Sequence, residues 1–285
     1  MSDGPTDSRN DGVTIVKIGG ALLDDVAGVE SLLERFAAID GAKILVHGGG
    51  PQADRMLHAL GSEPRKEEGR RITDDAALDV AVMVYAGLNG KRIVAALQRL
   101  GCDAIGLSGA DANVLRAVRR PVGAIDYGAV GDLEEGAVNV ERLHGLIASG
   151  LVPVLNAITH DGAGNLLNTN ADTIAAVVAA ALAPAALAPA APVDLLFVME
   201  RPGLLADPGD DASVIAHVDP DAIARLQAEG IISGGMTPKI TNALAALRAG
   251  VRSVRIGDGE MLRDRTAGTT ITLDGAAVRS EEGGR

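Results

Sequence analysis

The feature that most limits the possible folds of this chain is a regular alternation of short apolar runs with longer helix-like stretches. The apolar runs predict β-strands at residues 13–18, 43–47, 103–107, 151–155, 194–199 and 252–256. The stretches between them predict helices at residues 28–38, 51–60, 74–99 (broken near 87–90), 140–149, 171–182, 219–228 and 237–249. Strands that alternate with helices are typical of a parallel sheet covered by helices, so the sequence predicts an α/β fold.

The composition supports this fold class and argues against several functions. The chain has 285 residues, of which 47% are hydrophobic but only 1% aromatic. Its core must therefore consist mainly of Ala, Val, Leu and Ile, the usual filling of helix-covered parallel sheets. The net charge of −12 argues against a nucleic-acid partner, because a phosphate backbone demands a basic surface. A single cysteine, Cys102, excludes an internal disulfide.

The ends of the chain and one internal segment indicate its organisation. Residues 1–12 predict a disordered polar tail, and residues 13–285 predict one domain. We recognise no signal peptide and no run long and clean enough to span a membrane, so we expect a cytoplasmic protein. The Ala- and Pro-rich segment 179–192 could be a linker between two halves, 13–185 and 193–275, or a surface connection within one continuous sheet.

Three glycine clusters fall where a predicted strand gives way to a predicted helix. They lie in residues 17–20, 46–57 and 232–244. Glycine at such a turn lets backbone N–H groups approach an anion, and the helix dipole favours negative charge there. Each cluster alone has an ordinary reading as turn chemistry, but the three together favour a phosphate site. Neither G-x-x-x-x-G-K-S/T nor an opening G-x-G-x-x-G is present, so this site differs from the two familiar nucleotide fingerprints.

Charged and polar residues accompany these clusters. Two of the chain's five lysines, Lys17 and Lys239, lie in glycine clusters, which suits a polyphosphate whose charge shifts during a reaction. Asp172 follows a predicted hairpin at 158–169 and could bridge two lysines or help to hold magnesium. The alternative for that segment is simple helix capping by Asn170.

Arg71 and His47 are two further candidates. Arg71 offers the guanidinium fork that pairs naturally with a substrate carboxylate, although a solvated charged surface would also explain its segment. His47 ends a predicted strand beside glycines, where we expect it to be packed or hydrogen-bonded. We assign it no proton transfer.

With these residues in view, the chain resembles the amino acid kinase family, and within it the members that phosphorylate an acylated glutamate. The resemblance covers residues 13–272 and rests on motifs in the family's order: K-I-G-G, V-H-G-G-G-P-Q, G-R-R-I-T-D, A-G-L-N-G-K-R-I, G-L-S-G-x-D-x-N, N-T-N-A-D-T and I-S-G-G-M-x-P-K. It implies a three-layer αβα sandwich with a mainly parallel central sheet. Residues 13–185 would bind the acyl amino acid and residues 193–275 the nucleotide.

The resemblance also implies an activity and a set of roles. The expected reaction is ATP-dependent phosphorylation of the side-chain carboxylate of N-acetyl-L-glutamate, a step of arginine biosynthesis, with Mg²⁺ bound through ATP and not by a protein metal site. Lys17 and Lys239 would neutralise charge on the transferred phosphoryl group, and Asp172 would position both. The backbone N–H groups of Gly19, Gly20 and Gly48 would face the phosphates, whereas the amino acid would be held by Gly49, Gly50, Arg71 and Asn168. ATP would lie along Glu200, Gly203, Leu205, Ile231, Ser233, Gly234 and Gly235.

The sequence departs from the family pattern in three places. Before the nucleotide loop, Met199 and Glu200 replace the usual Thr and Asp, and Arg201 adds a charge. Near the C-terminus, only Gly268 and Thr269 of a familiar segment remain. The long N-terminal helix of arginine-inhibited hexamers is missing, so we expect a homodimer without arginine feedback.

Three alternatives remain at this stage. The substrate could be N-succinylglutamate or a related N-acyl amino acid, because the acyl pocket cannot be read from sequence. A non-catalytic metabolite sensor on the same fold draws support from Glu200 and Arg201 but has no need of two phosphoryl-stabilising lysines. A dinucleotide-dependent dehydrogenase lacks its fingerprint.

Overall fold

The structure is a computed structural model that describes residues 12–67, 70–183 and 192–273. The predicted tail lies outside the described residues except for Gly12, as does most of the predicted linker segment 179–192.

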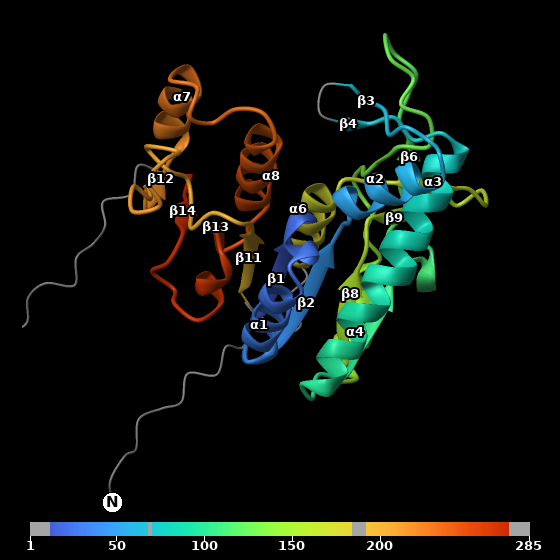
Figure 1. Ribbon diagram of the computed structural model, residues 1–285. Helices are drawn as coiled ribbons and strands as arrows, with labels where there is room; N and C mark the ends of the chain where they lie inside the picture. Colours follow the sequence, from blue (N-terminus) through green and yellow to red (C-terminus); the bar gives the residue numbers. More distant parts are fainter. Residues whose placement is uncertain (1–11, 68–69, 184–191, 274–285) are drawn as a thin grey trace, which may run out of the picture.

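A single eight-stranded sheet runs through the molecule in the order β12-β14-β13-β11-β1-β2-β8-β5 (Figure 1). All neighbouring strands are parallel except β13 and β14. The strands are β1 (Val13–Ile18), β2 (Ala42–His47), β5 (Ala104–Leu107), β8 (Val152–Leu155), β11 (Val193–Val198), β12 (His217–Val218), β13 (Ser253–Gly257) and β14 (Thr269–Ile271). The six predicted strands are thus confirmed to within one residue. The last two strands at one end of the sheet, β12 and β14, were not predicted, because two or three residues leave no apolar run to recognise.

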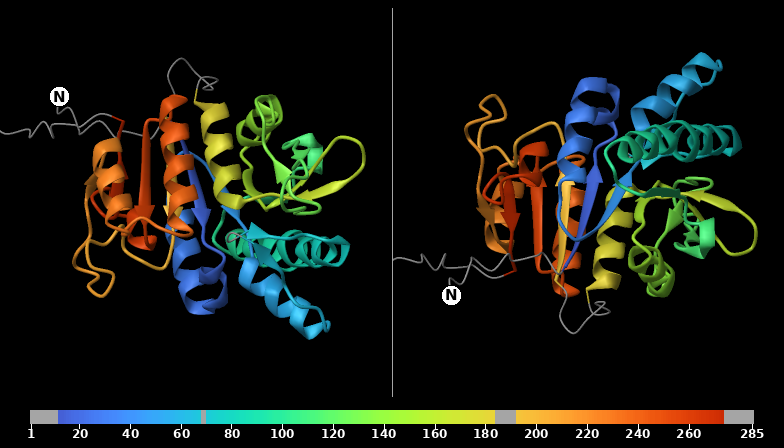
Figure 2. Two further views of the ribbon diagram at one scale, coloured as in Figure 1. Left: turned by 90° about the horizontal axis from the view of Figure 1, so that it is seen from above. Right: turned by 90° about the horizontal axis from the view of Figure 1, so that it is seen from below.

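Helices cover both faces of this sheet and make three layers (Figure 2). One face is covered by α5 (Val140–Ala148), α6 (Ala171–Leu182) and α8 (Met236–Arg248), and the other by α1 (Val26–Ala37) and α4 (Gly90–Arg99). Alternate residues of β1 enter the two cores: Ile15 packs with the residues of α6, and Val16 packs with Phe36 of α1. A strand buried on both faces needs a continuous apolar run, which is why these strands could be found in the sequence.

The long helical segment predicted at 74–99 is continuous, so the predicted break near residues 87–90 is wrong. It consists of α3 (Asp75–Ala81), a π-helical segment η2 (Val82–Asn89) and α4. The N–H of Gly90 donates to the carbonyl of Tyr85, and a Cβ at position 90 would lie 3.0 Å from that oxygen. Glycine therefore permits a wide turn here instead of ending the helix.

Among the described residues, this helix is the one segment that is long and apolar enough to cross a membrane by length and composition, with a mean hydropathy of 1.3 over its most apolar window. The expectation that no such run exists is corrected in this respect. Core helices pass the same test, and here Val80, Val84 and Leu97 are buried against the rest of the protein.

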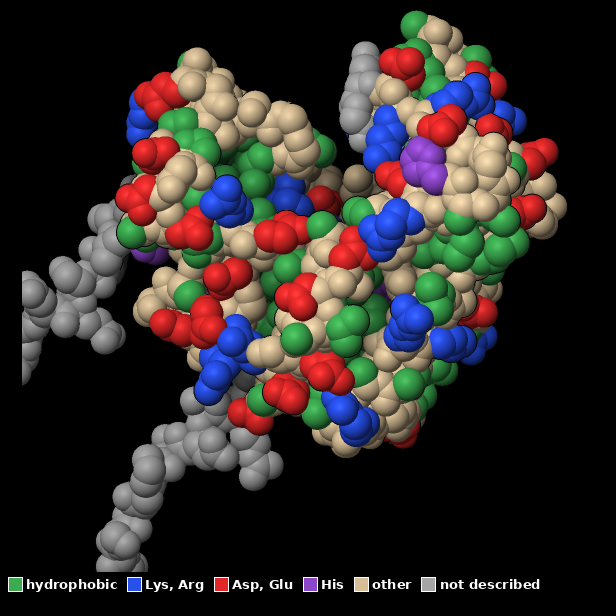
Figure 3. All heavy atoms as spheres, in the orientation of Figure 1, with side chains coloured by type: hydrophobic (Ala, Val, Ile, Leu, Met, Phe, Trp, Pro, Cys, Tyr) green, Lys and Arg blue, Asp and Glu red, His purple; other side chains and the backbone are tan. Residues whose placement is uncertain are grey.

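The remaining elements decorate the ends of the sheet. They are the helices α2 (Gly50–Ala59) and α7 (Pro220–Ala228), the short helices η1 (Ala21–Asp24), η3 (Asp111–Asn113) and η4 (Gly259–Leu262), and the strand pairs β3–β4 (Lys66–Glu67, Arg70–Arg71), β6–β7 (Val118–Arg119, Gly131–Asp132) and β9–β10 (Ile158–His160, Leu166–Asn168). The β9–β10 pair is the predicted hairpin at 158–169. Figure 3 shows a hollow between the part of the surface built by α7 and α8 and the part built by α2, α3 and the β3–β4 hairpin.

Candidate active site

Lys17 is the fifth residue of β1, and its side chain points to the face covered by α6. It shares that face with Ile15 because side chains two residues apart lie on the same side of a strand. Its Nζ lies 2.6 Å from Oδ1 of Asp172 on α6. An ammonium group is thereby held at the end of a buried strand.

Lys239 reaches the same carboxylate from the second half of the chain. It lies in the first turns of α8, and its Nζ donates to Oδ2 of Asp172 at 2.7 Å. The same Nζ stands 5.0 Å from the ring centroid of Phe197, the β11 residue paired with Lys17 across the sheet. The ring attracts the ammonium group by a cation–π interaction and fixes it beside Lys17.

Asp172 is the second residue of α6 and bridges the two lysines. Asn170 caps this helix, because its Oδ1 accepts from the N–H groups of Asp172 (2.8 Å) and Thr173 (3.1 Å). The predicted cap and the predicted lysine bridge therefore coexist in one segment. The expectation that Lys17 and Lys239 converge on Asp172 is confirmed in its geometry, whereas the catalytic roles stay a prediction.

The electrostatics of this trio favour an anionic ligand. Burial raises the pKa of Asp172, but the two ammonium groups outweigh it and hold the pKa below its usual range. Burial, helped by Lys17, lowers the pKa of Lys239, and Asp172 and Glu200 oppose that effect. The Lys17 and Lys239 side chains are each only 10% exposed. Two ammonium groups share one carboxylate, which leaves an excess of positive charge in a site with little water to screen it.

The first two glycine turns meet beside this trio. A Cβ on Gly20 would lie 3.3 Å from the backbone N of Gly50 and 3.5 Å from that of Gly49, and one on Gly48 would lie 3.7 Å from Cβ of Ala171, the neighbour of Asp172. The N–H groups of Gly20, Gly48 and Gly49 donate to no acceptor within the described part of the chain. The N–H of Gly19 is different: it donates to the carbonyl of Val198 at 2.9 Å, so its predicted availability to phosphate is not met in this structure.

Gln52, which the sequence did not single out, joins these turns. Its Nε2 donates to the carbonyl of Gly20 at 2.8 Å and to Oδ1 of Asp24 at 2.6 Å. Its position in the quoted motif V-H-G-G-G-P-Q was the available signal. The glycine turns are therefore tied to each other by a side chain as well as by the sheet.

The residues predicted to hold the amino acid surround Gly50. Arg71 is already paired: its Nη1 lies 2.6 Å from Oδ1 of Asp54, and its Nη2 donates to the carbonyl of Gly50 at 3.0 Å. Nδ2 of Asn168 donates to Oγ1 of Thr73, two residues beyond Arg71, at 3.1 Å. Arg71 and Asn168 are thus brought to one region, but the guanidinium of Arg71 is not a free fork.

The residues predicted along the nucleotide lie in two places. Exposed Glu200 is close enough to Lys239 to influence its pKa, whereas Gly203 and Leu205 are buried in the loop that follows β11. Thr269 supports that loop, because its Oγ1 accepts from the N–H of Leu204 at 2.8 Å. Ser233, Gly234 and Gly235 are exposed directly before α8, and Ile231 is partly buried at the start of the same loop.

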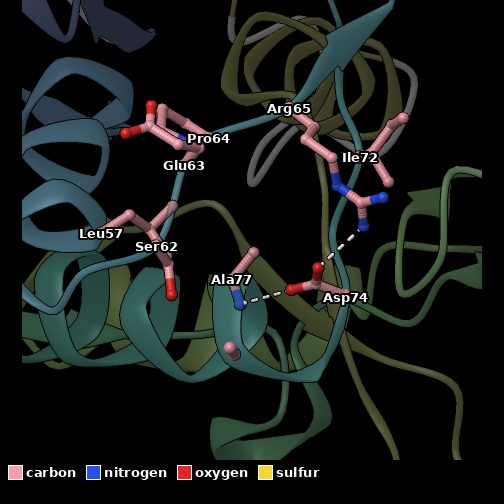
Figure 4. A pocket seen from close by; sticks show the side chains of 9 residues that line it. Leu57, Ser62, Glu63, Pro64, Arg65, Ile72, Asp74 and Ala77 are labelled. Carbon is pink, nitrogen blue, oxygen red and sulfur yellow. Dashed lines mark hydrogen bonds and ion pairs between the residues drawn. The ribbon is translucent and has the colours of Figure 1, made fainter.

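Two other features of the described residues bear on the location of the site. A small pocket lies between α2, β4 and α3, where Arg65 and Ala77 both contact Asp74 (Figure 4). None of its lining residues belongs to the predicted site, so it is not the candidate active site. The described part of the chain holds no group of three or more His, Cys, Asp or Glu side chains arranged to bind a metal ion.

Comparisons with known proteins identify the family to which the chain is similar. The sequence profile of the amino acid kinase family matches residues 12–258. An acetylglutamate kinase of Phocaeicola vulgatus is 49% identical over 244 residues, which cover 86% of this chain and 92% of that protein. An acetylglutamate kinase of Methanopyrus kandleri is 37% identical over 252 residues, covering 87% and 96% of the two chains.

Solved structures share the fold. A Streptococcus mutans protein is 25% identical with a TM-score of 0.75, and the alignment covers 93% of this chain and 100% of that one. A carbamate kinase of Giardia is 14% identical with a TM-score of 0.65, covering 92% and 99%. The αβα sandwich predicted from sequence is therefore confirmed.

Proposed function

This chain belongs to the amino acid kinase family, and we propose that it transfers the γ-phosphoryl group of ATP to the side-chain carboxylate of N-acetyl-L-glutamate. The products are N-acetylglutamyl 5-phosphate and ADP. The observation that carries the proposal is the carboxylate of Asp172 bridging Lys17 and Lys239 at 2.6 and 2.7 Å. The substrate and the arginine-biosynthetic context come from the names of the relatives. These are acetylglutamate kinases, and the match covers most of their length.

The chemistry asks little of the protein beyond placement and charge. A carboxylate is already a nucleophile at neutral pH, so no general base is needed, and the phosphoryl group passes in line from the leaving oxygen of ADP to the carboxylate oxygen. Charge that develops on the phosphoryl oxygens is stabilised by preorganised donors in a dry site. Lys17 and Lys239 supply the positive charge that balances it, and Asp172 holds both ammonium groups in place before the substrates arrive.

Backbone groups complete the phosphate end. The N–H groups of Gly20 and Gly48 have no acceptor among the described residues and lie beside the Lys17–Asp172–Lys239 group. Helix α8 begins just after exposed Gly234 and Gly235, with the positive end of its dipole at that point. ATP fits this combination of N–H groups, which have no acceptor among the described residues, and excess positive charge. We assign no residue of this chain as a ligand of Mg²⁺, which would enter with the phosphates of ATP and would offset part of their negative charge.

The amino-acid end is assigned to Gly49, Gly50, Arg71 and Asn168. Arg71 presents a buried guanidinium that Asp54 and the Gly50 carbonyl already orient. A substrate carboxylate would replace one of these contacts, and Arg71 would keep the other, which holds its side chain in position. This makes Arg71 an anchor whose position is set before binding.

We place the enzyme in the cytoplasm and propose that it works as a homodimer. Support for self-association comes from Met83 and Leu88, which are 58% and 40% exposed on the long central helix. Light scattering should give twice the chain mass of 28.9 kDa, and a monomeric mass at micromolar protein would contradict this part of the proposal.

The activity is tested by trapping the acyl phosphate with hydroxylamine. Purified protein with MgATP and N-acetyl-L-glutamate should form the hydroxamate and an equal amount of ADP. Parallel reactions with N-succinyl-L-glutamate and with free glutamate decide the acyl group. The assignment would be overturned if none of the three compounds supported ATP consumption. Faster turnover of the succinyl compound would replace the acetyl substrate while keeping the chemistry.

A further inference from the structure

The carbonyl group of Gly48 receives hydrogen bonds from two buried side chains. Nδ1 of His47 lies 3.0 Å from this oxygen, and Nδ2 of Asn89 lies 3.4 Å from it. His47 is 0% exposed and Asn89 is 6% exposed. Burial of a polar group is costly unless the group is hydrogen-bonded, and both side chains find a hydrogen-bond acceptor at this one backbone oxygen.

The protonation of His47 follows from its surroundings. Burial lowers the pKa of His47 to about 4, although its contact with the Gly48 carbonyl opposes this, so the ring is neutral near pH 7. A carbonyl oxygen can only accept, which places the single ring proton on Nδ1. Nε2 is then a bare acceptor, and it has no partner among the described residues. His47 therefore acts as a fixed hydrogen-bond donor and is not a general base.

Fixing the Gly48 carbonyl also fixes the next N–H group. No peptide bond in the described residues is cis, and in a planar trans peptide the C=O of one residue and the N–H of the next point in opposite directions. Holding the Gly48 oxygen against the buried side chains of His47 and Asn89 therefore turns the Gly49 N–H away from them. That N–H donates to no described acceptor. It lies where the turn at Gly49 meets the turn at Gly20, beside Lys17, Asp172 and Lys239.

Two local features maintain this arrangement. A Cβ on Gly49 would lie 2.5 Å from Nδ2 of Asn89 and 2.8 Å from Cδ1 of Tyr85, so only glycine allows the close approach. Asn89 is the last residue of the π-helical segment Val82–Asn89, and the wide turn closed by Gly90 sets the direction of its side chain. Short π-helical segments inside helices are frequent at functional sites, and this one delivers a donor to the glycine turn.

We propose that His47 and Asn89 are positioning residues that hold the Gly48–Gly49 peptide so that the Gly49 N–H donates to an anionic oxygen at the reacting end of the substrates. This inference rests on the proposed function for its reaction but not for its geometry. The stabilised oxygen belongs to the phosphoryl group in transit or to the carboxylate that receives it. In both cases the contact strengthens as charge develops, so its loss should lower kcat more than it raises KM.

Three substitutions test the clamp, by which we mean the hold of His47 and Asn89 on the Gly48–Gly49 peptide. His47→Phe keeps a flat ring but removes the donor, His47→Asn restores an N–H near the position of Nδ1, and Asn89→Leu removes the longer bond. We expect kcat to fall about tenfold or more in His47→Phe and less in Asn89→Leu, with either KM changing less than about threefold, and His47→Asn to recover most of the loss. Thr159→Val is the control: it removes a buried hydroxyl that bonds Thr169 2.8 Å away and should leave kcat unchanged.

The outcomes separate the clamp from a merely structural role. Equal losses in His47→Phe and His47→Asn, or wild-type kinetics in His47→Phe, would overturn the proposal while leaving the kinase assignment intact. If the wild-type chain does not use acetylglutamate, amide NMR with MgADP and aluminium fluoride still decides the matter. The Gly49 N–H resonance should shift when MgADP and aluminium fluoride are added to the wild type and should respond weakly in His47→Phe. An equal shift in both proteins would contradict the proposal.

Discussion

Lys17 and Lys239 share one carboxylate, and this sharing shapes the response to substitution. Replacing either lysine by alanine removes one positive charge but leaves Asp172 paired with the other lysine. The fold should therefore survive. Loss of one preorganised charge-stabilising group slows an enzyme roughly 10²–10³-fold, so we expect that loss of kcat in Lys17→Ala and in Lys239→Ala.

The matched control is Lys43→Ala, which removes another buried lysine. Its Nζ donates to the carbonyls of Ala37 and Ile39 at the end of α1, away from the glycine turns. Steady-state kinetics and circular dichroism on the three variants give the comparison. A near-normal kcat in either active-site variant, with the fold intact, would remove the proposed mechanism.

The lowered pKa of buried His47 leads to a prediction about stability that is independent of activity. Its pKa is about 4 in the folded protein against an ordinary value of 6.5, so the unfolded chain binds the extra proton first as the pH falls. The contribution of neutral His47 to the free energy of unfolding is therefore fully present above about pH 6.5. It declines toward pH 4, by about 3 kcal/mol for the full difference in pKa. Urea unfolding at pH 7.0 and 5.0 should show this loss in the wild type and a smaller loss in His47→Phe. An unchanged pH dependence in the variant would mean that other groups carry it.

At the scale of elements, the cap of α6 links stability to catalysis. Asn170→Ala removes the acceptor for the first N–H groups of α6, which should cost about 1 kcal/mol of unfolding free energy. Because Asp172 occupies that first turn, the change should also lower kcat. Asp219 caps α7 by accepting from the N–H of Ala222 at 2.7 Å, so Asp219→Ala should cost a similar amount of stability without the kinetic effect.

Urea unfolding and initial rates on both cap variants check this prediction. Equal kcat values in Asn170→Ala and Asp219→Ala would show that the placement of Asp172 does not depend on its helix cap. A kinetic loss confined to Asn170→Ala would assign the cap a part in holding the carboxylate between the lysines.

The elements that could be read from the sequence are those whose residues face a core on both sides or carry a recognisable cap. The strand at 13–18 is an unbroken run of apolar or β-branched residues up to Lys17, and Asn170 and Asp172 marked the start of α6. The π-helical segment could not be predicted, because Gly87 and Gly90 signal a break equally well. The site was foreseen in its lysines and glycine turns but not in Gln52 or Asn89, whose contacts join segments far apart in the chain. His47 is hydrogen-bonded as expected, but the sequence did not identify the Gly48 carbonyl as its partner.

At the scale of the whole molecule, the candidate active site is assembled across the two halves of the chain. Lys17 and Asp172 come from the first half and Lys239 from the second, and β1 pairs directly with β11 of the second half. One core runs from Leu143 on α5 to Ile240 on α8. A shared sheet and a shared core should make the two halves one cooperative unit, although we propose that each binds a different substrate.

Calorimetry distinguishes one unit from two. We expect a single thermal transition that moves as a whole when either N-acetyl-L-glutamate or a non-hydrolysable MgATP analogue is added alone. A ligand at 100 times its dissociation constant stabilises the native state by about 2.7 kcal/mol, which is enough to resolve the shift. Two transitions, with the acyl amino acid moving one and the nucleotide moving the other, would show that the halves unfold independently. In that case, the ion pair between Lys239 of the second half and Asp172 of the first half would be too weak to couple the unfolding of the two halves.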